Sequence, residues 1–407
     1  MAAFNVYLSY PTNEGYSDFI DITEDVIESS IGAIKQTLES DEFDVGKITF
    51  DNLNLTLRNE DATYSEASNA TSIFPLKRDQ SIIKIEWGIN SFPPACGNTP
   101  CGLTFLSWPR ILFKGLIEEN SAAFDVESQN ITFKVLGIDS IINKELTPYG
   151  LLTLGDDANT LIFKILNQDS IKKFFSVNQI NIDCKNNFIA DDIASLEGTS
   201  CLESIQEILK LANSIMFVKD DVIYIKAREE SLDSKFTFYG ASSNEGIENI
   251  SQVSDYGIGL NRTWNYWDWD DDPTLNVSFV DSIDLYGRRA KSLSSKLITD
   301  SGKILNVLTS YLNEFGFPKT ELTLTVPMYT PIVDLGFLDK INIDYPSEVL
   351  PTVDELSSKY GQAKYDSGYK YNRVINSLFI SISKNWKILN KTIQPRKQTI
   401  EFKVREV

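Results

Sequence analysis

Alternating apolar and polar residues dominate the first and last thirds of this 407-residue chain. Segment 47–57, KITFDNLNLTL, alternates apart from a phase shift at Asp51-Asn52, which predicts a bulge or corner there, and 320–326, TELTLTV, alternates strictly. This period of two is typical of strands with one buried face. Similar segments occur at 82–87, 110–117, 131–136 and 399–407. Short strands separated by polar turns favour a barrel or sandwich in each third.

The middle of the chain changes to helical spacing. Apolar residues in 158–175 recur every three or four positions, which predicts a helix, and the preceding Asp156-Asp157 suit the positive end of its dipole. Ser200 and Glu203 form a capping-box pattern before a second helix. The segment SIMFVKDDVIYIKAR then reads as a hairpin that turns at Asp220-Asp221.

One further helix is expected in the last third, over 303–315, with Ser301 as its cap and Gly316 and Pro318 at its end. The predicted fold class is therefore mainly β with an α+β insertion. We expect three parts: a β domain at 1–150, a small α/β module of two helices and a hairpin at 151–232, and a second β domain at 233–407.

The chain contains no histidine. Ser-His-Asp and Cys-His nucleophiles, HExxH zinc sites and imidazole acid–base catalysis are therefore excluded within it. Gly-rich phosphate-binding loops are absent from the sequence as well. Paired carboxylates remain available, but nothing in the sequence places two of them across a cleft. We expect no enzymatic activity and no cofactor.

The net charge is −19, from 57 acidic and 38 basic residues. A surface this acidic repels phosphate backbones, so tight non-specific binding of nucleic acid is not expected. The N-terminal MAAFNVYLSYP shows no secretory signal, and no run approaches the ~20 apolar residues of a membrane span. The sequence therefore predicts neither secretion nor an integral membrane segment.

The order of the strand segments resembles the tail-hub proteins of tailed bacteriophages. The first part of the resemblance is carried by GKITFDNLNLTLRNEDATYS, SIFPLKRDQSIIKIEWG, ILFKGLIEE and ITFKVLGIDSIINKEL, with Phe113-Lys114-Gly115 and Gly137-Ile138-Asp139 in the family's strand–turn–helix passage. The second part is carried by 281–293, 303–315, 320–326 and 333–345. The sequence departs from the family at 335–339, where LGFLD replaces a compact Leu-Gly-Asp-like turn.

This resemblance implies the tail-tube fold used twice, so that 1–150 and 233–407 would be tube-like β domains. It implies a homotrimer that adapts a sixfold tail tube to a threefold tip and lines the path of genome ejection. Its partners would be a tail-tube or distal-tail protein above and a fibre or tip protein below, in a virion assembled in host cytoplasm. DNA would pass without specific binding, along a wall made acidic by the chain's negative charge.

Two other functions stay open at the level of sequence. One is a distal-tail or tube ring protein present in six copies. The other is a sugar-binding or sugar-cleaving β protein, because residues 264–272 place aromatic rings beside carboxylates. The candidate sugar or calcium contacts in that stretch are Trp264, Trp267, Trp269, Asp268, Asp270 and Asp272. The alternative interpretation of the stretch is a strand with inward tryptophans followed by an acidic turn.

The loop 91–109 contains Cys96 and Cys101 with four residues between them. These two thiols can close a small disulfide, form half of a four-cysteine zinc site with Cys184 and Cys201, or stay free, as a reducing cytosol favours.

Two groups of residues are candidate interfaces. The apolar residues of the loop 91–109 either fold back on their own domain or dock on a neighbouring protein; they are Phe92, Leu103, Phe105 and Trp108. Arg288 and Arg289 form a local basic cluster, which is either a contact between subunits or an ordinary solvated face.

Overall fold

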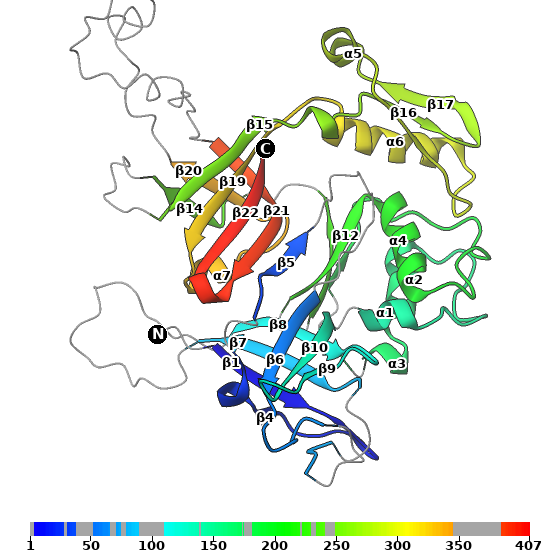
Figure 1. Ribbon diagram of the computed structural model, residues 1–407. Helices are drawn as coiled ribbons and strands as arrows, with labels where there is room; N and C mark the ends of the chain where they lie inside the picture. Colours follow the sequence, from blue (N-terminus) through cyan, green and yellow to red (C-terminus); the bar gives the residue numbers. More distant parts are fainter. Residues whose placement is uncertain are drawn as a thin grey trace, which may run out of the picture.

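The computed structural model describes most of the chain (Figure 1). The described residues are 4–27, 31–37, 52–65, 71–74, 79–88, 110–137, 140–172, 174, 181–219, 222–228, 233–240, 249–344 and 384–407. The fold is mainly β, with helices inserted between strands, as the alternating pattern predicts. Several expected features lie outside the described residues; these are Asp51 of the expected bulge, Ile138-Asp139, the hairpin turn at Asp220-Asp221 and the loop 91–109.

The first large sheet is built from the first third of the chain. Its strands in spatial order are β4 (Ile20–Asp21), β1 (Phe4–Ser9), β7 (Ile82–Trp87), β8 (Arg110–Ile117), β10 (Asn130–Gly137) and β6 (Asn52–Arg58), and β9 (Ala123–Asp125) pairs with β10. Val26, which follows the short η1 (Thr23–Asp25), bridges to Leu57 of β6. The chain after one edge strand thus reaches the opposite edge and curls the sheet toward a barrel. The small pair β2 (Pro11–Thr12) and β3 (Gly15–Tyr16) lies beside it.

The second large sheet combines distant parts of the sequence. Its order is β14 (Phe236–Tyr239), β20 (Lys340–Asp344), β21 (Lys384–Gln394), β22 (Thr399–Glu406), β19 (Thr320–Pro327) and β15 (Gln252–Ile258). β5 (Ile34–Thr37) pairs with β21, although it comes from the first third of the chain. This strand from the first third of the chain therefore connects the two large sheets. The short α7 (Thr330–Val333) and η6 (Pro395–Lys397) complete this part.

The middle module contains the expected helices and hairpin. Its elements are α1 (Ser140–Lys144), α2 (Ala158–Leu166), α3 (Asp169–Lys172), α4 (Cys201–Ala212) and a sheet of β11 (Asn181–Asp183), β13 (Val222–Ala227) and β12 (Ser214–Lys219). Asp157 caps α2 by accepting from the Thr160 amide at 2.7 Å. The capping box of Ser200 and Glu203 on α4 is confirmed. The periodic stretch after position 157 is split, however, because α2 ends at Leu166 and α3 starts afresh at Asp169.

A separate unit is inserted between β15 and β19. This inserted unit (residues 260–315) contains η4 (Leu260–Arg262), β16 (Tyr266–Trp269), β17 (Asp272–Ser278), α5 (Val280–Tyr286), β18 (Ala290–Leu293) and α6 (Ser301–Phe315). The expected helix is confirmed as α6, and Gly316 is its C-cap. The prediction that Ser301 is the cap is wrong. Asp300 is the N-cap, since its carboxylate accepts from the Lys303 amide and Ser301 is already helical.

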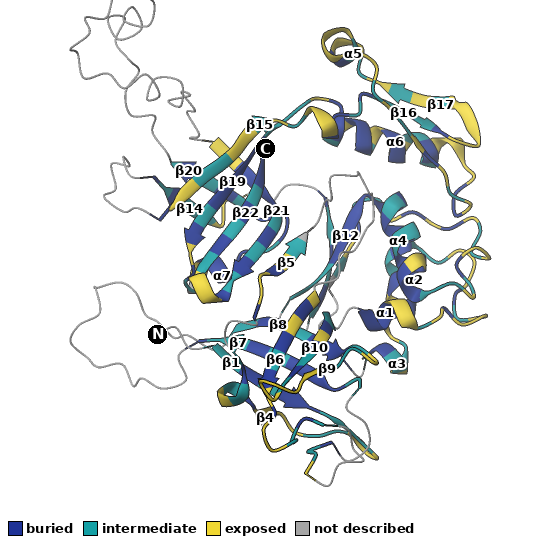
Figure 2. Cartoon of the chain, viewed as in Figure 1, coloured by how far each residue is buried: buried dark blue, intermediate teal, exposed yellow. Residues whose placement is uncertain are grey.

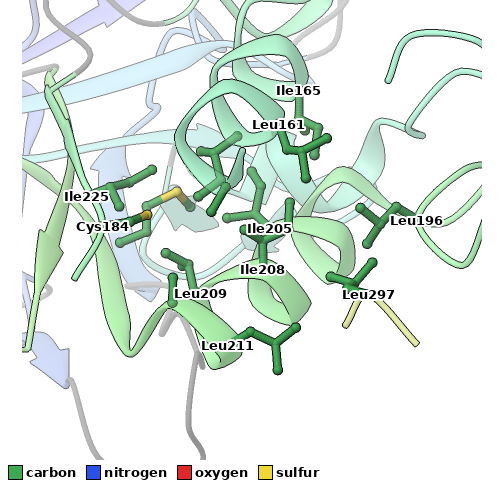
Figure 3. Packing of buried hydrophobic residues seen from close by; sticks show 14 of the residues in the cluster. Leu161, Ile165, Cys184, Leu196, Ile205, Ile208, Leu209, Leu211, Ile225 and Leu297 are labelled. Carbon is green, nitrogen blue, oxygen red and sulfur yellow. The ribbon is translucent and has the colours of Figure 1, made fainter. Parts of the chain in front are cut away.

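Two large apolar cores and one small cluster, formed by Ile215, Phe337 and Leu338, pack the described residues together. One joins the two large sheets, with Leu55 and Phe133 from the first and Leu324 and Phe402 from the second. The other joins the middle module to the inserted unit; Figure 3 shows Leu297 of the inserted unit among the module's side chains. Figure 2 shows buried positions alternating along the strands of both large sheets. The domain boundaries at 150 and 232 remain a prediction. The inserted unit packs on the middle module as well as on the second large sheet.

Candidate functional site

The aromatic and acidic stretch 264–272 forms part of a core. Trp267 and Trp269 alternate along β16 and are 0% and 3% exposed. Trp267 stacks on Tyr311 of α6, with ring centroids 5.1 Å apart, and its Nε1 donates to the Trp264 carbonyl at 2.9 Å. Neither buried ring presents a face to a sugar. The stretch is thus a strand with inward tryptophans, which the alternation itself favours.

The acidic residues of this stretch are used locally. Asp268 accepts from the Ser292 hydroxyl on β18, and Asp272 accepts from the amide and hydroxyl of Thr274. Asp270 is exposed in the turn before β17. Within the described part of the chain, no cluster of three or more Cys, Asp or Glu side chains is arranged to hold a metal ion. The structure therefore brings no calcium site together here.

The four cysteines fall into two groups. Cys184 and Cys201 are free and buried, and burial raises the pKa of the Cys184 thiol to about 12. The Cys201 thiol accepts from the Gln168 side-chain amide at 3.1 Å, and burial raises its pKa as well. Cys96 and Cys101, together with Phe92, Leu103, Phe105 and Trp108, lie outside the described residues. Their proposed disulfide and docking roles stay predictions.

The basic pair lies where α5 leads into β18. The guanidinium carbon of Arg288 is 3.7 Å from the centroid of the Tyr266 ring, and Arg288 is exposed. The Arg289 amide donates to the side-chain oxygen of the buried Asn265, whose amide nitrogen in turn donates to the Gly287 carbonyl. Asn265 thus holds this turn in place and presents both arginines on the surface of the inserted unit.

A buried ionic cluster joins three parts of the molecule, and sequence reasoning did not find it. Glu321 of β19 accepts from Nε and Nη2 of Arg405 of β22, at 3.0 and 2.9 Å. Arg262 of η4 and Lys403 pair with the same carboxylate, at 3.7 and 3.6 Å. The carboxylate thereby connects the inserted unit to the second sheet.

The same cluster reaches the middle module through Glu314 of α6. Glu314 Oε1 lies 3.4 Å from Arg228 Nε, directly after β13, and 3.3 Å from Lys387 Nζ of β21. The guanidinium carbons of Arg228 and Arg405 lie 5.5 and 5.6 Å from the centroid of the Phe315 ring. Buried ion pairs of this kind fix relative orientation, because each charge needs its partner out of water.

The turn before β20 is a second junction. Asp334 pairs with Arg110 of the first sheet, with 2.6 Å between Oδ1 and Nε. The carbonyl of Asp334 also accepts from Lys219 of β12. Lys391 of β21 donates to the carbonyls of Val333 and Leu335 at 2.5 and 2.9 Å. One turn therefore contacts the first sheet, the middle module and the second sheet.

Asp339 closes this turn. Its Oδ2 accepts from the Gly336 amide at 2.8 Å, and its Oδ1 accepts from Lys235 and Lys226 at 2.6 and 3.4 Å. Leu338, the residue before Asp339, has a left-handed φ of +59°, which is uncommon for a residue with a Cβ atom. The turn spans 335–339, where the sequence departs from the tail-hub pattern.

Comparison with known proteins gives the fold. No protein-family model matches the chain, and no curated protein matches it. Among solved structures, it is similar to a tail protein from Neisseria meningitidis, with TM-score 0.56 and 10% identity, over 99% of this chain and 96% of that one. It is also similar to the 43 kDa tail protein of prophage MuSo2 from Shewanella oneidensis, with TM-score 0.52, 9% identity and coverage of 100% and 98%.

A third similar structure is the prophage tail protein gp18 from Listeria monocytogenes, with TM-score 0.50, 10% identity and coverage of 98% and 94%. All three matches extend over nearly the full length of both chains. The chain therefore has the fold of phage and prophage tail proteins, and the resemblance stated from the strand order is confirmed at that level. No helix of the described residues is both long and apolar enough to cross a membrane.

Proposed function

We propose that this protein is a structural component of a phage tail tip, a tail hub, rather than an enzyme. The observation that carries the proposal is the full-length structural similarity to tail proteins. The match to the tail protein from Neisseria meningitidis covers 99% of this chain and 96% of that protein. Partial matches would leave one sheet unexplained, whereas here both sheets and the parts between them are shared. The ionic junctions support the same role, because their pairs connect the inserted unit, the middle module and both large sheets.

In this proposal three copies form a ring that presents six large sheets to a sixfold tail tube. A tail-tube or distal-tail protein binds above, a fibre or tip protein binds below, and DNA leaves through the ring during genome ejection. β5 supports such a platform, since it fixes the two sheets of each copy to one another. The place of action is the virion, after assembly in the host cytoplasm.

The test is the mass of the purified full-length chain, measured by sedimentation equilibrium and by negative-stain images. We expect a species of three chains and a ring with six lobes around an opening. A ring of six chains would instead support a distal-tail or tube protein. A monomer at all concentrations would contradict the hub proposal.

A further inference from the structure

The short strand β5 covers part of one edge of β21. β22 pairs with β21 along one side, from Trp386 to Gln394. On the other side of β21, β20 pairs with residues 384–387 and β5 pairs with residues 390–393. Figure 1 shows β5 in blue between the red strands of the second sheet and the strands of the first sheet. Without β5, the backbone of 390–393 would present an unpaired sheet edge, which we call the acceptor edge.

Few contacts hold β5 on the acceptor edge. Its pairing with β21 consists of four residue pairs. Ile31 and Ile34 are 5% and 1% exposed, and both belong to the core between the two large sheets. Gly32, Ala33 and Lys35 are exposed, and a Cβ atom at Gly32 would meet no atom beyond its chain neighbours within 4 Å. β5 and the residues before it are therefore anchored by two buried side chains and a short ladder.

The neighbouring strand β22 is held by many more contacts. It has eight residues and pairs with β21 on one side and with β19 on the other. Its Arg405 also donates to the buried carboxylate of Glu321. In contrast, no side chain of 31–36 makes a hydrogen bond or an ion pair with another of the described residues. Segments with few buried apolar contacts and one paired side open at a lower free energy than strands inside a sheet.

We infer that β5 is a displaceable strand and that the acceptor edge is a site for an added strand, which β5 covers in this structure. When β5 leaves the edge, both large sheets stay folded. The edge then binds an extended chain through backbone hydrogen bonds to 390–393, with an apolar side chain in the position that Ile34 vacates. The inference concerns a single chain, so it does not rest on the number of copies in the proposed hub.

The sequence of β5 shows which strand the acceptor edge accepts. Ile34 lies opposite Ile393 and both belong to the same core, so this position takes a large apolar residue. The exposed Lys35 lies opposite Thr392, so the next position takes a polar residue. Ile31 supplies the second buried side chain. The partner is therefore an extended segment with large apolar residues three positions apart, small residues between them and polar residues after them.

Hydrogen exchange of the wild-type full-length chain, read by mass spectrometry at single residues, tests whether β5 opens by itself. Successive amides of β21 point to alternate sides, so some amides of 390–393 face β5 and the others face β22. We expect the β5-facing amides to exchange at least about 100-fold faster than the β22-facing amides. Equal exchange of the two sets would overturn the inference, because β5 would then leave the edge only when the sheet unfolds.

Low concentrations of urea separate local opening from unfolding of the sheet. Displacing β5 exposes little surface, so the β5-facing amides should exchange less than about twofold faster per molar urea. Amides of 322–326, in β19 inside the same sheet, should exchange about fivefold faster or more per molar urea. The same acceleration of both sets would contradict a separate opening of β5.

A variant of β5 tests what holds the strand. Ile34→Ala removes a buried side chain and should speed the exchange of the β5-facing amides by about thirtyfold or more. Lys35→Ala is the matched control, because Lys35 is exposed on the same strand, and its exchange should stay within about threefold of the wild type. Unchanged exchange in Ile34→Ala would refute the inference. The wild-type measurements decide the question if this variant fails to fold by circular dichroism.

A labelled synthetic peptide with the sequence of 31–37, IGAIKQT, is the probe for the acceptor edge. It should bind Ile34→Ala at least about tenfold more tightly than the wild type, because the edge is open in a larger fraction of the molecules. A peptide of the same composition in scrambled order is the control and should bind neither protein measurably. Equal binding of both peptides, or no binding of IGAIKQT to the folded variant, would reject the strand site.

These results are distinguishable from the test of the proposed function. A trimer in which β5 opens only with the whole sheet overturns the inference and leaves the hub proposal standing. A monomer in which β5 opens by itself and the peptide binds supports the inference and contradicts the hub proposal.

Discussion

Removing the Glu321 carboxylate should destabilise the protein strongly. The substitution Glu321→Gln keeps the shape of the side chain but leaves three cations at the junction without their shared charge. Arg405 donates twice to this carboxylate, and Arg262 and Lys403 lie 3.7 and 3.6 Å from it. The Arg405 and Arg262 side chains are 3% and 4% exposed, so water cannot replace the carboxylate.

The expected loss follows from this burial. Breaking a buried ion pair by removing one partner costs about 3–5 kcal/mol. The amide oxygen of glutamine still accepts one hydrogen bond from Arg405, so we expect about 3 kcal/mol. With an unfolding entropy of ~2.1 cal/mol/K per residue, this corresponds to a fall in melting temperature of about 3.5 °C when the whole chain unfolds together.

Differential scanning calorimetry measures this change, with Glu401→Gln as the matched control. Glu401 lies on β22 on the same face of the same sheet, opposite Thr325, and is half-exposed. No ion pair of Glu401 occurs among the described residues. Its substitution should change stability by less than about 0.5 kcal/mol. Equal melting temperatures for the Glu321 and Glu401 variants would refute the argument that the cluster holds the parts together.

Three further results are expected. Gly115→Ala should reduce the free energy of unfolding by about 1–3 kcal/mol, seen as a lower urea midpoint, because the added Cβ would lie 2.3 Å from the Leu136 carbonyl oxygen. Hydrogen bonds from Lys303 and from backbone amides hold the pKa of Asp191 at about 2. The stabilisation from this carboxylate is therefore complete above its usual pKa and is lost as the pH falls through about 2. In Asp191→Asn, the melting temperature should depend less on pH over this range than in the wild type. The pKa of about 12 predicts that the Cys184 peptide is not alkylated by iodoacetamide at pH 8 until the chain is unfolded.

Much of the fold could be predicted because its strands follow local rules. Segment 82–87 becomes β7 and 110–117 becomes β8, both with the expected bounds, because both are rich in residues that favour strands. Both faces of this strand pair contribute buried residues, since Ile83 and Ile85 belong to the core between the large sheets whereas Ile82 and Leu116 belong to the other core. The pairing of β5 with β21 could not be predicted, since the two strands are about 350 residues apart in sequence and β5 has only four residues. Local pattern says which face of a strand is buried, but not which distant strand lies beside it.

The ionic junctions had no clear signal in the sequence. Lys403 and Arg405 alternate with apolar residues along β22, which is also the pattern of a solvated strand face. They are buried or half-buried because the inserted unit places Glu314 and Phe315 over this face of the sheet. The same alternation correctly favoured inward rings for Trp267 and Trp269, since there the apolar residues themselves define the buried face.

The distribution of charge limits which surface can face DNA in the proposed hub. On the faces of the two large sheets that point away from their shared core, bases and acids are nearly balanced. In the first sheet these residues are Arg58, Lys84, Lys114 and Lys134 against Asp21, Glu86 and Asp125. In the second they are Lys35, Lys340 and Lys403 against Asp344 and Glu401, since Lys387, Arg405 and Glu321 are buried under the inserted unit.

These faces therefore do not carry the net charge of −19 of the whole chain. The excess of acids lies elsewhere, for example in the exposed turn at Asp270 and Asp271 and in the loop that begins at Glu118. Net charge sums over all surfaces, so it predicts solubility but not the sign of any one wall. A wall that lets DNA pass by repulsion therefore has to be built from the acidic turns of this chain rather than from the outward faces of its two large sheets.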